Sequence, residues 1–408
     1  MKKFWDKWTE IALVKRILVG LILGAVLGIA VPQATGIAIL GDVFVSALKA
    51  IAPLLVFFLV ISSLCNAGKS HGGVIKTVII LYMFSTVLAA VIAVFASMAF
   101  PVKMTLANAA TDTSAPQGIV EVLNNLLLNV VANPVSSLVN ANYVGILMWA
   151  VLLGLAFRAA DKMTKKVLAD VADGISMVVT WIINLAPFGI FGLVFNTVST
   201  NGLDIFTTYG KLLLLLVGCM LFIYFVTNPL LVYWCIRQNP YPLIFHCLKR
   251  SALTAFFTRS SAANIPVNMK VCEEMGLDRD TYSVTIPLGA TINMDGAAIT
   301  ITVMTMATAF TLGIHVDIPT AIILSLLAAL SACGASGVAG GSLLLIPMAC
   351  SLFGISDDIS MQVVAVGFII GVVQDSVETA LNSSSDLLLS ASAEFRQWRF
   401  EGKEIKFK

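Results

Sequence analysis

The chain has 408 residues, of which 58% are hydrophobic and only 12% are charged. Soluble domains carry about 25% charged residues, so this composition excludes a soluble protein and indicates one that crosses a membrane several times. The net charge of +2 is too small to suggest a nucleic-acid partner, and the seven scattered cysteines and three dispersed histidines predict neither a disulfide framework nor a zinc site.

Apolar segments before residue 240 are candidate membrane spans, since about 20 apolar residues cross a bilayer. They are residues 12–31, 43–65, 74–100, 144–157 with its polar N-terminal extension, 175–198 and 212–236. A polar loop, 101–117, follows the third span, and we interpret the asparagine-bearing stretch 118–141 as broken helices packed on protein. Lysines and tryptophans before the first span predict a short helix at the membrane surface, and we expect the first span to be retained rather than cleaved.

Lysine and arginine residues gather in alternate loops, which predicts the orientation of the spans. Lys15 and Arg16 lie on the basic side, whereas the loops on the opposite side hold little beyond Lys103 and Lys211. Because cytoplasmic loops carry the excess of basic residues, we expect both termini in the cytoplasm. The expected location is the bacterial inner membrane.

Beyond residue 240 the pattern changes to short apolar pieces, small-residue turns and long helices. The first unit has a short piece, a serine-bearing turn, a second short piece and an interrupted helix, at residues 243–257, 258–261, 266–272 and 284–311. The second unit has the same order, at residues 321–330, 331–342, 343–353 and 363–389. Each hairpin returns to its starting side and each helix crosses once, so the second unit is inverted relative to the first. Inverted repeats of this kind are typical of transporters.

The last helix carries a polar stripe within apolar sequence, formed by Asp375, Glu378, Thr379, Asn382 and Asp386. At about 100° per residue these positions fall within a sector of roughly 100°. An ionised side chain facing lipid would cost roughly 3 kcal/mol, so the carboxylates must line a cavity inside the protein, where they attract cations. The alternative is that these residues form a helix end whose charges are solvated at the water interface. A second polar cluster elsewhere in the chain makes this alternative less favoured.

That second cluster is Asn293-Met294-Asp295-Gly296, within an apolar segment. The glycine permits an unwound turn that frees backbone carbonyls, and Asp295 supplies charge. In a soluble protein the same residues would be a surface turn, but here they lie between apolar sequences. Oxygen ligands without cysteine or histidine favour a hard cation, and Na⁺ before any transition metal.

The chain resembles the dicarboxylate/amino acid:cation symporter family, the glutamate transporters and their neutral amino acid relatives, over essentially its whole length. Four ordered motifs carry the resemblance: the turn Thr258-Arg-Ser-Ser-Ala-Ala-Asn-Ile-Pro266, the segment 293–296, the Gly/Ser-rich turn 331–342 and the polar stripe. Within the family the chain is most similar to bacterial members that carry serine and threonine with sodium.

The resemblance implies an all-α membrane protein with eight transmembrane helices plus two re-entrant helical hairpins, in inverted repeats and with a glutamate-transporter-like fold. Residues 1–240 would form a scaffold of six spans, residues 241–392 a transport domain with hairpin 1, broken helix 7, hairpin 2 and helix 8, and residues 393–408 a cytoplasmic tail. A homotrimer and an elevator-type motion are implied as well.

Site residues also follow from the resemblance. Asp375 would receive the α-ammonium of an amino acid, and the other substrate-binding positions would be Arg259, Ser260, Ser261, Ala297, Val338, Glu378, Thr379 and Asn382. One Na⁺ site would use Gly289, Asn293, Asn382 and Asp386. A second would use Thr291, Met294 and carbonyls near Ala332, Cys333 and Ala335. A third would use Tyr82, Ser85, Thr86 and Asp295, although the first three are equally readable as ordinary polar residues of a span.

Two departures from the family pattern bear on the substrate. Members that carry acidic substrates have an arginine where this chain has Glu378, and a glutamate would repel a second carboxylate. Ala297 replaces a threonine. A small neutral amino acid fits these changes, and a hydroxyl that donates to Glu378 favours serine and threonine. Alternatively, Glu378 holds a proton or a cationic side chain.

We therefore expect a secondary active transporter that imports small neutral hydroxy amino acids, serine and threonine, by sodium symport. The alternatives are a proton- or cation-coupled transporter of another amino acid and an ion channel. An enzyme is not expected, because neither hairpin holds a histidine and no GxSxG or GxGD sequence occurs. The sequence contains no phosphate-binding loop of the form GxxxxGK[ST], so it does not support ATP-driven transport.

Overall fold

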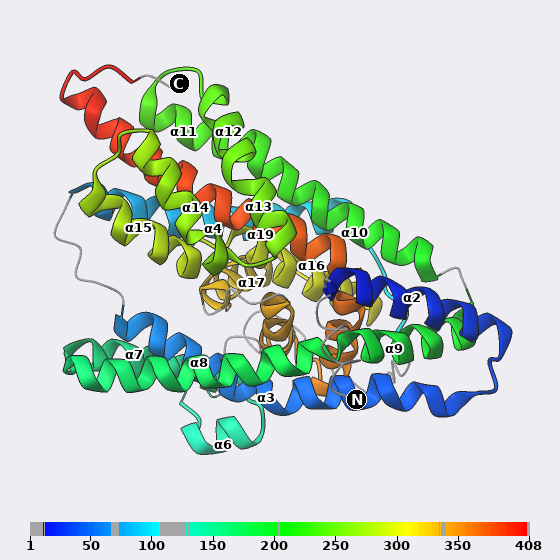
Figure 1. The fold of residues 1–408 in the computed structure, drawn as a ribbon. Coiled ribbons are helices and arrows are strands. Elements are labelled where there is room, and N and C mark those ends of the chain that lie inside the picture. The colour runs from blue at the N-terminus through cyan, green and yellow to red at the C-terminus, as the bar shows by residue number, and fades with distance from the viewer. Residues whose placement is uncertain are drawn as a thin grey trace.

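The structure is a computed structural model that describes residues 11, 13–66, 73–106, 128, 131–202, 205–333, 335 and 340–405. Within these ranges the chain is helical, as predicted, and has no β-strand (Figure 1). Six of the described helices are long and apolar enough to cross a membrane. The chain is therefore a multi-pass membrane protein. The expected surface helix at residues 1–10, the loop from residue 107 and most of the stretch 118–141 lie outside the described residues.

One layer of the molecule runs along the lower part of Figure 1. Its elements are α2 (Leu13–Ala30), η1 (Thr35–Ile37), α3 (Ala38–Asn66), α6 (Pro134–Val139), α7 (Tyr143–Ala156), η2 (Phe157–Ala159), α8 (Lys162–Asn184) and α9 (Ala186–Asn201). Helix α3 packs against α7, α8 and α9, and α2 packs along α9. At Gly20 a Cβ atom would lie 2.2 Å from the Pro187 carbonyl oxygen, so α2 and α9 approach as closely as only glycine permits.

The predicted span 175–198 is divided in the structure. Helix α8 begins earlier, at Lys162, and ends at Asn184, and α9 begins at Ala186 with Pro187 in its first turn. Proline lacks the N–H that a continuing helix would need, but in a first turn that N–H would be unpaired anyway. The two helices therefore run end to end with a break at Leu185 (Figure 1).

The other layer contains the third apolar helix and everything after residue 205. Its elements are α4 (Gly73–Ala99), α10 (Ile205–Phe222), η3 (Ile223–Thr227), α11 (Asn228–Ile236), α12 (Tyr241–Cys247), η4 (Leu248–Ala252), α13 (Leu253–Thr258), α14 (Ser261–Glu274), α15 (Arg279–Ile292), α16 (Asp295–Thr311), α17 (Ile318–Ala332), η5 (Gly341–Leu345), α18 (Ile346–Ser351) and α19 (Asp357–Phe400). Helix α4 packs against α15, α16, α17 and α19, and α10 and α11 pack on α19.

Helix α16 is the centre of this layer, because every residue from Asp295 to Ala309 is buried. A helix that is apolar all round requires neighbours on every side, and α4, α17, α18 and α19 supply them. Its first turn follows the predicted interruption, where α15 ends at Ile292 and Asn293 and Met294 leave the helical conformation.

Two turns bring short helices together near this centre. Helices α13 and α14 meet at Arg259, whose φ is 52°, and at Ser260, whose side chain accepts a hydrogen bond from the Ala263 N–H. Helix α17 and the segment η5–α18 flank the Gly/Ser-rich turn, of which residues 334 and 336–339 lie outside the described residues.

Helix α19 has 44 residues and extends the predicted helix 363–389 at both ends. Its length of about 66 Å exceeds the hydrocarbon thickness of about 30 Å, so its ends reach beyond the membrane core. The Ser356 side chain caps it, and Asp357 and Asp358 in the first turn oppose the positive end of the helix dipole.

Candidate functional site

The interrupted helix and α19 meet through amide and carboxylate groups. The Asn293 amide donates to Asp386 Oδ1 and to Ser385 Oγ, each at 2.8 Å. The backbone N–H of Gly296, in the first turn of α16, donates to Asn382 Oδ1 at 2.7 Å. The first turn of a helix has N–H groups without intrahelical partners, and Asn382 satisfies one of them. The segment 293–296 and the polar stripe, whose residues the family resemblance places in one Na⁺ site, are therefore in contact.

Asp295 points to the opposite side of α16, toward α4. Its Oδ2 accepts from the Ser85 hydroxyl at 2.7 Å, and its Oδ1 accepts from the Thr86 hydroxyl at 3.2 Å. The Met294 N–H donates to the same Thr86 hydroxyl at 3.3 Å. Ser85 and Thr86 therefore lie at the interruption, next to Asp295, with which the family resemblance groups them.

Tyr82, one turn before Ser85 and Thr86, contacts the backbone of a different acidic residue, Asp386. Its hydroxyl is 2.8 Å from the Asp386 carbonyl oxygen and 2.9 Å from Ser390 Oγ. No hydrogen bond between Tyr82 and Asp295 occurs among the described residues. Helix α4 thus supplies groups to both sides of the interruption.

Two carboxylates at the interruption have no cationic side chain paired with them in the described part of the chain. Asp295 is 0% and Asp386 1% exposed. Asn293 Oδ1, which is also buried, has no hydrogen-bond partner among the described residues. Buried charges and buried unpaired oxygens cost free energy unless they are compensated. A hard cation that takes oxygen ligands would compensate them, so this set of donor atoms fits Na⁺.

Gly289 lies one turn before the interruption, against Asp386. A Cβ atom there would lie 2.7 Å from Asp386 Oδ1 and 2.8 Å from the Tyr82 hydroxyl oxygen. Each of these groups is held by a hydrogen bond, so neither can move away without losing a contact.

Gly289→Ala is therefore expected to displace the Asp386 carboxylate and to lower the affinity for Na⁺ by about tenfold, equivalent to about 1.4 kcal/mol. The measurement is the rise in unfolding temperature of the purified protein with increasing sodium concentration. Gly174→Ala, on α8, where an added Cβ meets nothing within 4 Å, is the matched control. An unchanged sodium dependence in Gly289→Ala would contradict the role of this glycine.

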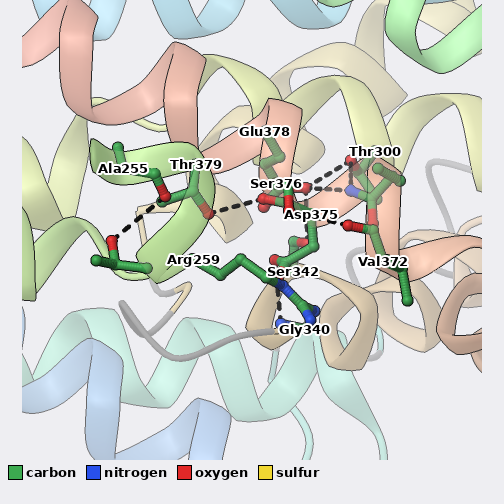
Figure 2. Close-up of polar contacts among 12 residues, drawn as sticks. Ala255, Arg259, Thr300, Gly340, Ser342, Val372, Asp375, Ser376, Glu378 and Thr379 are labelled. Atoms are coloured by element: carbon green, nitrogen blue, oxygen red, sulfur yellow. Dashed lines mark hydrogen bonds and ion pairs between the residues drawn. The ribbon is translucent and has the colours of Figure 1, made fainter. Parts of the chain in front are cut away.

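A second cluster lies about 16 Å along α19 from Asp386, at 1.5 Å per residue. Asp375 Oδ2 accepts from Arg259 Nε at 2.6 Å, and its Oδ1 accepts from the Gly340 N–H at 3.1 Å (Figure 2). Asp375 therefore connects the turn between α13 and α14 with the segment before η5. The Arg259 and Asp375 side chains are only 10% and 4% exposed, so the ion pair is largely shielded from water.

Glu378 lies beside Asp375 and accepts three hydrogen bonds at its Oε2 atom. The donors are the Thr300 hydroxyl at 2.7 Å, the Ser342 hydroxyl at 3.0 Å and the Gln374 amide at 2.5 Å (Figure 2). Thr300 comes from α16 and Ser342 from η5. Glu378 thus joins three elements of the second layer.

Gln374, Thr300 and Ser342 were not predicted as site residues from the sequence. Gln374 precedes Glu378 by one helical turn and so lies on the polar stripe, which was an available signal. Thr300 is one of several threonines in an otherwise apolar helix, and no pattern distinguishes it from the others. Ser342 ends a turn that is rich in small residues, and only the fold shows that it faces Glu378.

The remaining predicted residues have varied surroundings. The Thr379 hydroxyl donates to the Asp375 carbonyl oxygen at 2.8 Å, and Asn382 Nδ2 is 3.5 Å from the sulfur of Met294. Ser261 and Ala297 are buried. Thr291 is exposed, and its hydroxyl donates to the Leu288 carbonyl oxygen.

The Gly/Ser-rich turn begins beside the interrupted helix. Cys333 Sγ is 3.6 Å from the carbonyl oxygen of Ile292, the last residue of α15. This contact brings the end of α17 to the end of α15. Val338, a predicted substrate contact, lies outside the described residues.

Comparison with known proteins gives a consistent result. Residues 13–394 match the sodium:dicarboxylate symporter family. A serine/threonine transporter SstT of Bifidobacterium adolescentis is 58% identical over 401 residues, covering 98% of this chain and 93% of that protein. The SstT proteins of Streptococcus thermophilus and Streptococcus agalactiae are 55% and 57% identical, and the alignments cover 98% and 97% of this chain and 100% and 98% of those proteins.

Proposed function

We propose that this chain, which belongs to the sodium:dicarboxylate symporter family, imports serine and threonine together with sodium. The names of the relatives support this choice of substrates, because those proteins are serine/threonine transporters and are alike over nearly the full length of the chain. The observation that carries the proposal is the pair of buried carboxylates, Asp295 and Asp386, which flank the interruption without a paired cation among the described residues.

Sodium is the cargo that would compensate these carboxylates. Around Asp386 it would be bound by the side-chain oxygens of Asn293, Asn382 and Asp386, and around Asp295 by the hydroxyls of Ser85 and Thr86 and the carboxylate itself. Because Asn293 and Gly296 also hold the interruption against α19, sodium binding would order the same backbone that borders the amino acid site. Sodium and substrate affinities would then rise together, each by the same factor.

The amino acid would bind between the two turns, beside α19. Its ammonium group would take the Asp375 carboxylate, in competition with Arg259, which now pairs with it. Its side-chain hydroxyl would donate to Glu378, which already accepts hydrogen bonds from two hydroxyl groups. A buried site that satisfies a hydroxyl discriminates strongly against analogues that lack it.

The finer architecture of eight transmembrane helices plus two re-entrant hairpins in inverted repeats is part of the proposal. The tight turn at Arg259 between α13 and α14, and the packing of α17 against α18, support two hairpins. The division into a scaffold at 1–240 and a transport domain at 241–392 stays a prediction. The packing of α4, α10 and α11 against α15–α19 supports a moving unit that includes these three helices as well.

Where α3 of the first layer meets α19 of the second, an aromatic pair, Phe44 and Phe368, and an exposed ion pair connect the two layers. Lys49 Nζ of α3 is 3.2 Å from Asp357 and 2.6 Å from Asp358, at the start of α19. The Lys49 side chain is 39% and that of Asp358 86% exposed, so the contact stabilises this arrangement by about 1 kcal/mol or less. From the family resemblance, we also propose that the protein is a homotrimer in the bacterial inner membrane.

Purified protein in proteoliposomes tests the function directly. Labelled serine is expected to accumulate when sodium is outside and to remain at background when choline replaces it, and unlabelled threonine should compete whereas aspartate should not. Counterflow distinguishes a carrier from a channel, because a pore cannot exchange internal for external serine. Equal accumulation in choline, or serine flux without counterflow, would rule the proposal out.

A further inference from the structure

A groove between α4 and α10 is not used by the proposed transport site. It has a volume of about 840 Å³ and is lined by Ile92, Phe95 and Phe100 on one side and by Leu214, Gly218 and Phe222 on the other. Cavities that bind small molecules have volumes of about 300–1,000 Å³. The groove is therefore large enough to hold a ligand.

The dimensions of the groove match one leaflet of a bilayer. Its lining residues lie at positions 92–99 of α4, at residues 100–102 that follow this helix, and at positions 211–222 of α10. At 1.5 Å per residue the α10 stretch is about 16 Å long, which is about half of the hydrocarbon thickness of about 30 Å, and the helical part of the α4 stretch is about 10 Å long. In the predicted orientation the two helices run in opposite directions, so Lys211 lies level with the C-terminal end of α4, near the non-cytoplasmic surface.

The surface of the groove suits an acyl chain. Leu214 is 74%, Phe100 68% and Phe95 54% exposed. Apolar side chains that are exposed on a membrane-spanning helix face the hydrocarbon core of the bilayer. Because the chain crosses the membrane, the molecules that meet this surface are lipids.

Among the described residues, the only charged side chain that lines the groove is Lys211. None of the ion pairs in the described part of the chain involves Lys211. A lysine near the end of a membrane helix extends its ammonium group toward the headgroups, and anionic headgroups attract it by about 1 kcal/mol. The groove thus has apolar walls about as long as one leaflet of the bilayer and a lysine side chain near the membrane surface.

We propose that this groove binds one anionic phospholipid of the surrounding bilayer, with an acyl chain between α4 and α10 and the headgroup on Lys211. Both helices also pack against the elements that carry the site, α4 on α16 and α10 on α19. A bound lipid therefore stabilises the contact of these two helices with the rest of their layer.

Two variants separate the parts of the proposal. Gly218 is exposed on the groove wall, and an added Cβ there meets nothing within 4 Å, so we expect the side chain of Gly218→Leu to occupy part of the groove. Gly174→Leu is the matched control, because Gly174 is equally exposed and equally open but lies on α8. Lys211→Gln removes the charge and leaves the apolar walls intact.

The experiment titrates delipidated protein in detergent with phosphatidylglycerol or with phosphatidylcholine of the same chains, and follows lipid binding by native mass spectrometry. The wild-type protein and Gly174→Leu should prefer phosphatidylglycerol by about fivefold. Lys211→Gln should lose that preference and still bind both lipids, whereas Gly218→Leu should bind both at least fivefold more weakly.

Full preference for phosphatidylglycerol in Lys211→Gln would overturn the headgroup assignment. Unchanged lipid binding in Gly218→Leu would overturn the site itself, and so would a change in oligomeric mass in that variant, which would identify a second copy of the chain as the occupant. Sodium-dependent serine uptake by all of these variants tests the transport proposal separately, because none of the altered residues belongs to that site.

Discussion

Asp386→Asn is expected to lower the affinity for sodium by at least about 100-fold, because removing one charge from a buried ion pair costs about 3 kcal/mol or more. Asparagine has nearly the same shape as aspartate and retains an oxygen that accepts from Asn293, so the contact with α15 is kept. The proposed amino acid contacts at Asp375 and Glu378 lie about 16 Å and about 12 Å from Asp386 along α19, and we expect them to be unchanged. Serine binding therefore weakens at low sodium and recovers at high sodium.

The measurement is the dissociation constant of serine across a series of sodium concentrations. The curve for Asp386→Asn should shift to higher sodium by the same factor as the sodium affinity, with the same limit at saturation. Asp280→Asn, at an exposed position in the first turn of α15, serves as the control and should behave like the wild type. Serine binding that keeps its full sodium dependence in Asp386→Asn would show that the cation binds elsewhere.

Glu378→Arg should reverse the choice between neutral and acidic amino acids. The present carboxylate repels a second carboxylate on the substrate, and an arginine in its place would attract one. The three groups that donate to Glu378, from Thr300, Ser342 and Gln374, are neutral, and the neighbouring Asp375 carboxylate is already paired with Arg259, so an acidic substrate would supply the counter-charge for the new guanidinium. We expect serine affinity to fall at least tenfold and aspartate affinity to rise at least tenfold.

Competition of unlabelled aspartate against labelled serine, together with direct uptake of labelled aspartate, measures this reversal. Glu378→Gln provides an isosteric comparison, because it removes the repulsion but adds no positive charge. It should admit aspartate weakly and tests the assignment even if the arginine variant does not fold. Aspartate that is excluded equally from the wild type and from both variants would contradict the assignment of Glu378 to substrate choice.

The parts of the fold that could be predicted from the sequence are those where charged side chains lie within apolar segments. Asp375, Glu378 and Asp386 could not face lipid, so their helix had to be buried, and all three are buried in the structure. The interruption between Ile292 and Asp295 followed from the same reasoning. The division at Leu185 was missed because the apolar run is continuous there, although Pro187 was a signal for it.

The parts that could not be predicted depend on how separate helices meet. Ser85 and Thr86 could be grouped with Asp295 only through family resemblance, because they precede it by about 210 residues and are ordinary in a span. Ser342 contributes to the Glu378 cluster only because α18 and η5 pack against α16. The groove at Lys211 is lined by residues that resemble any lipid-facing surface in sequence.

The most direct test of the account is the reciprocity between sodium and serine in the purified wild-type protein. Calorimetry gives the dissociation constant of serine at low and at saturating sodium, and that of sodium without and with saturating serine. If sodium holds the interruption against α19 beside the amino acid, both affinities improve by the same factor. A serine affinity that is independent of sodium would mean that the buried carboxylates at the interruption do not bind the cation that drives transport.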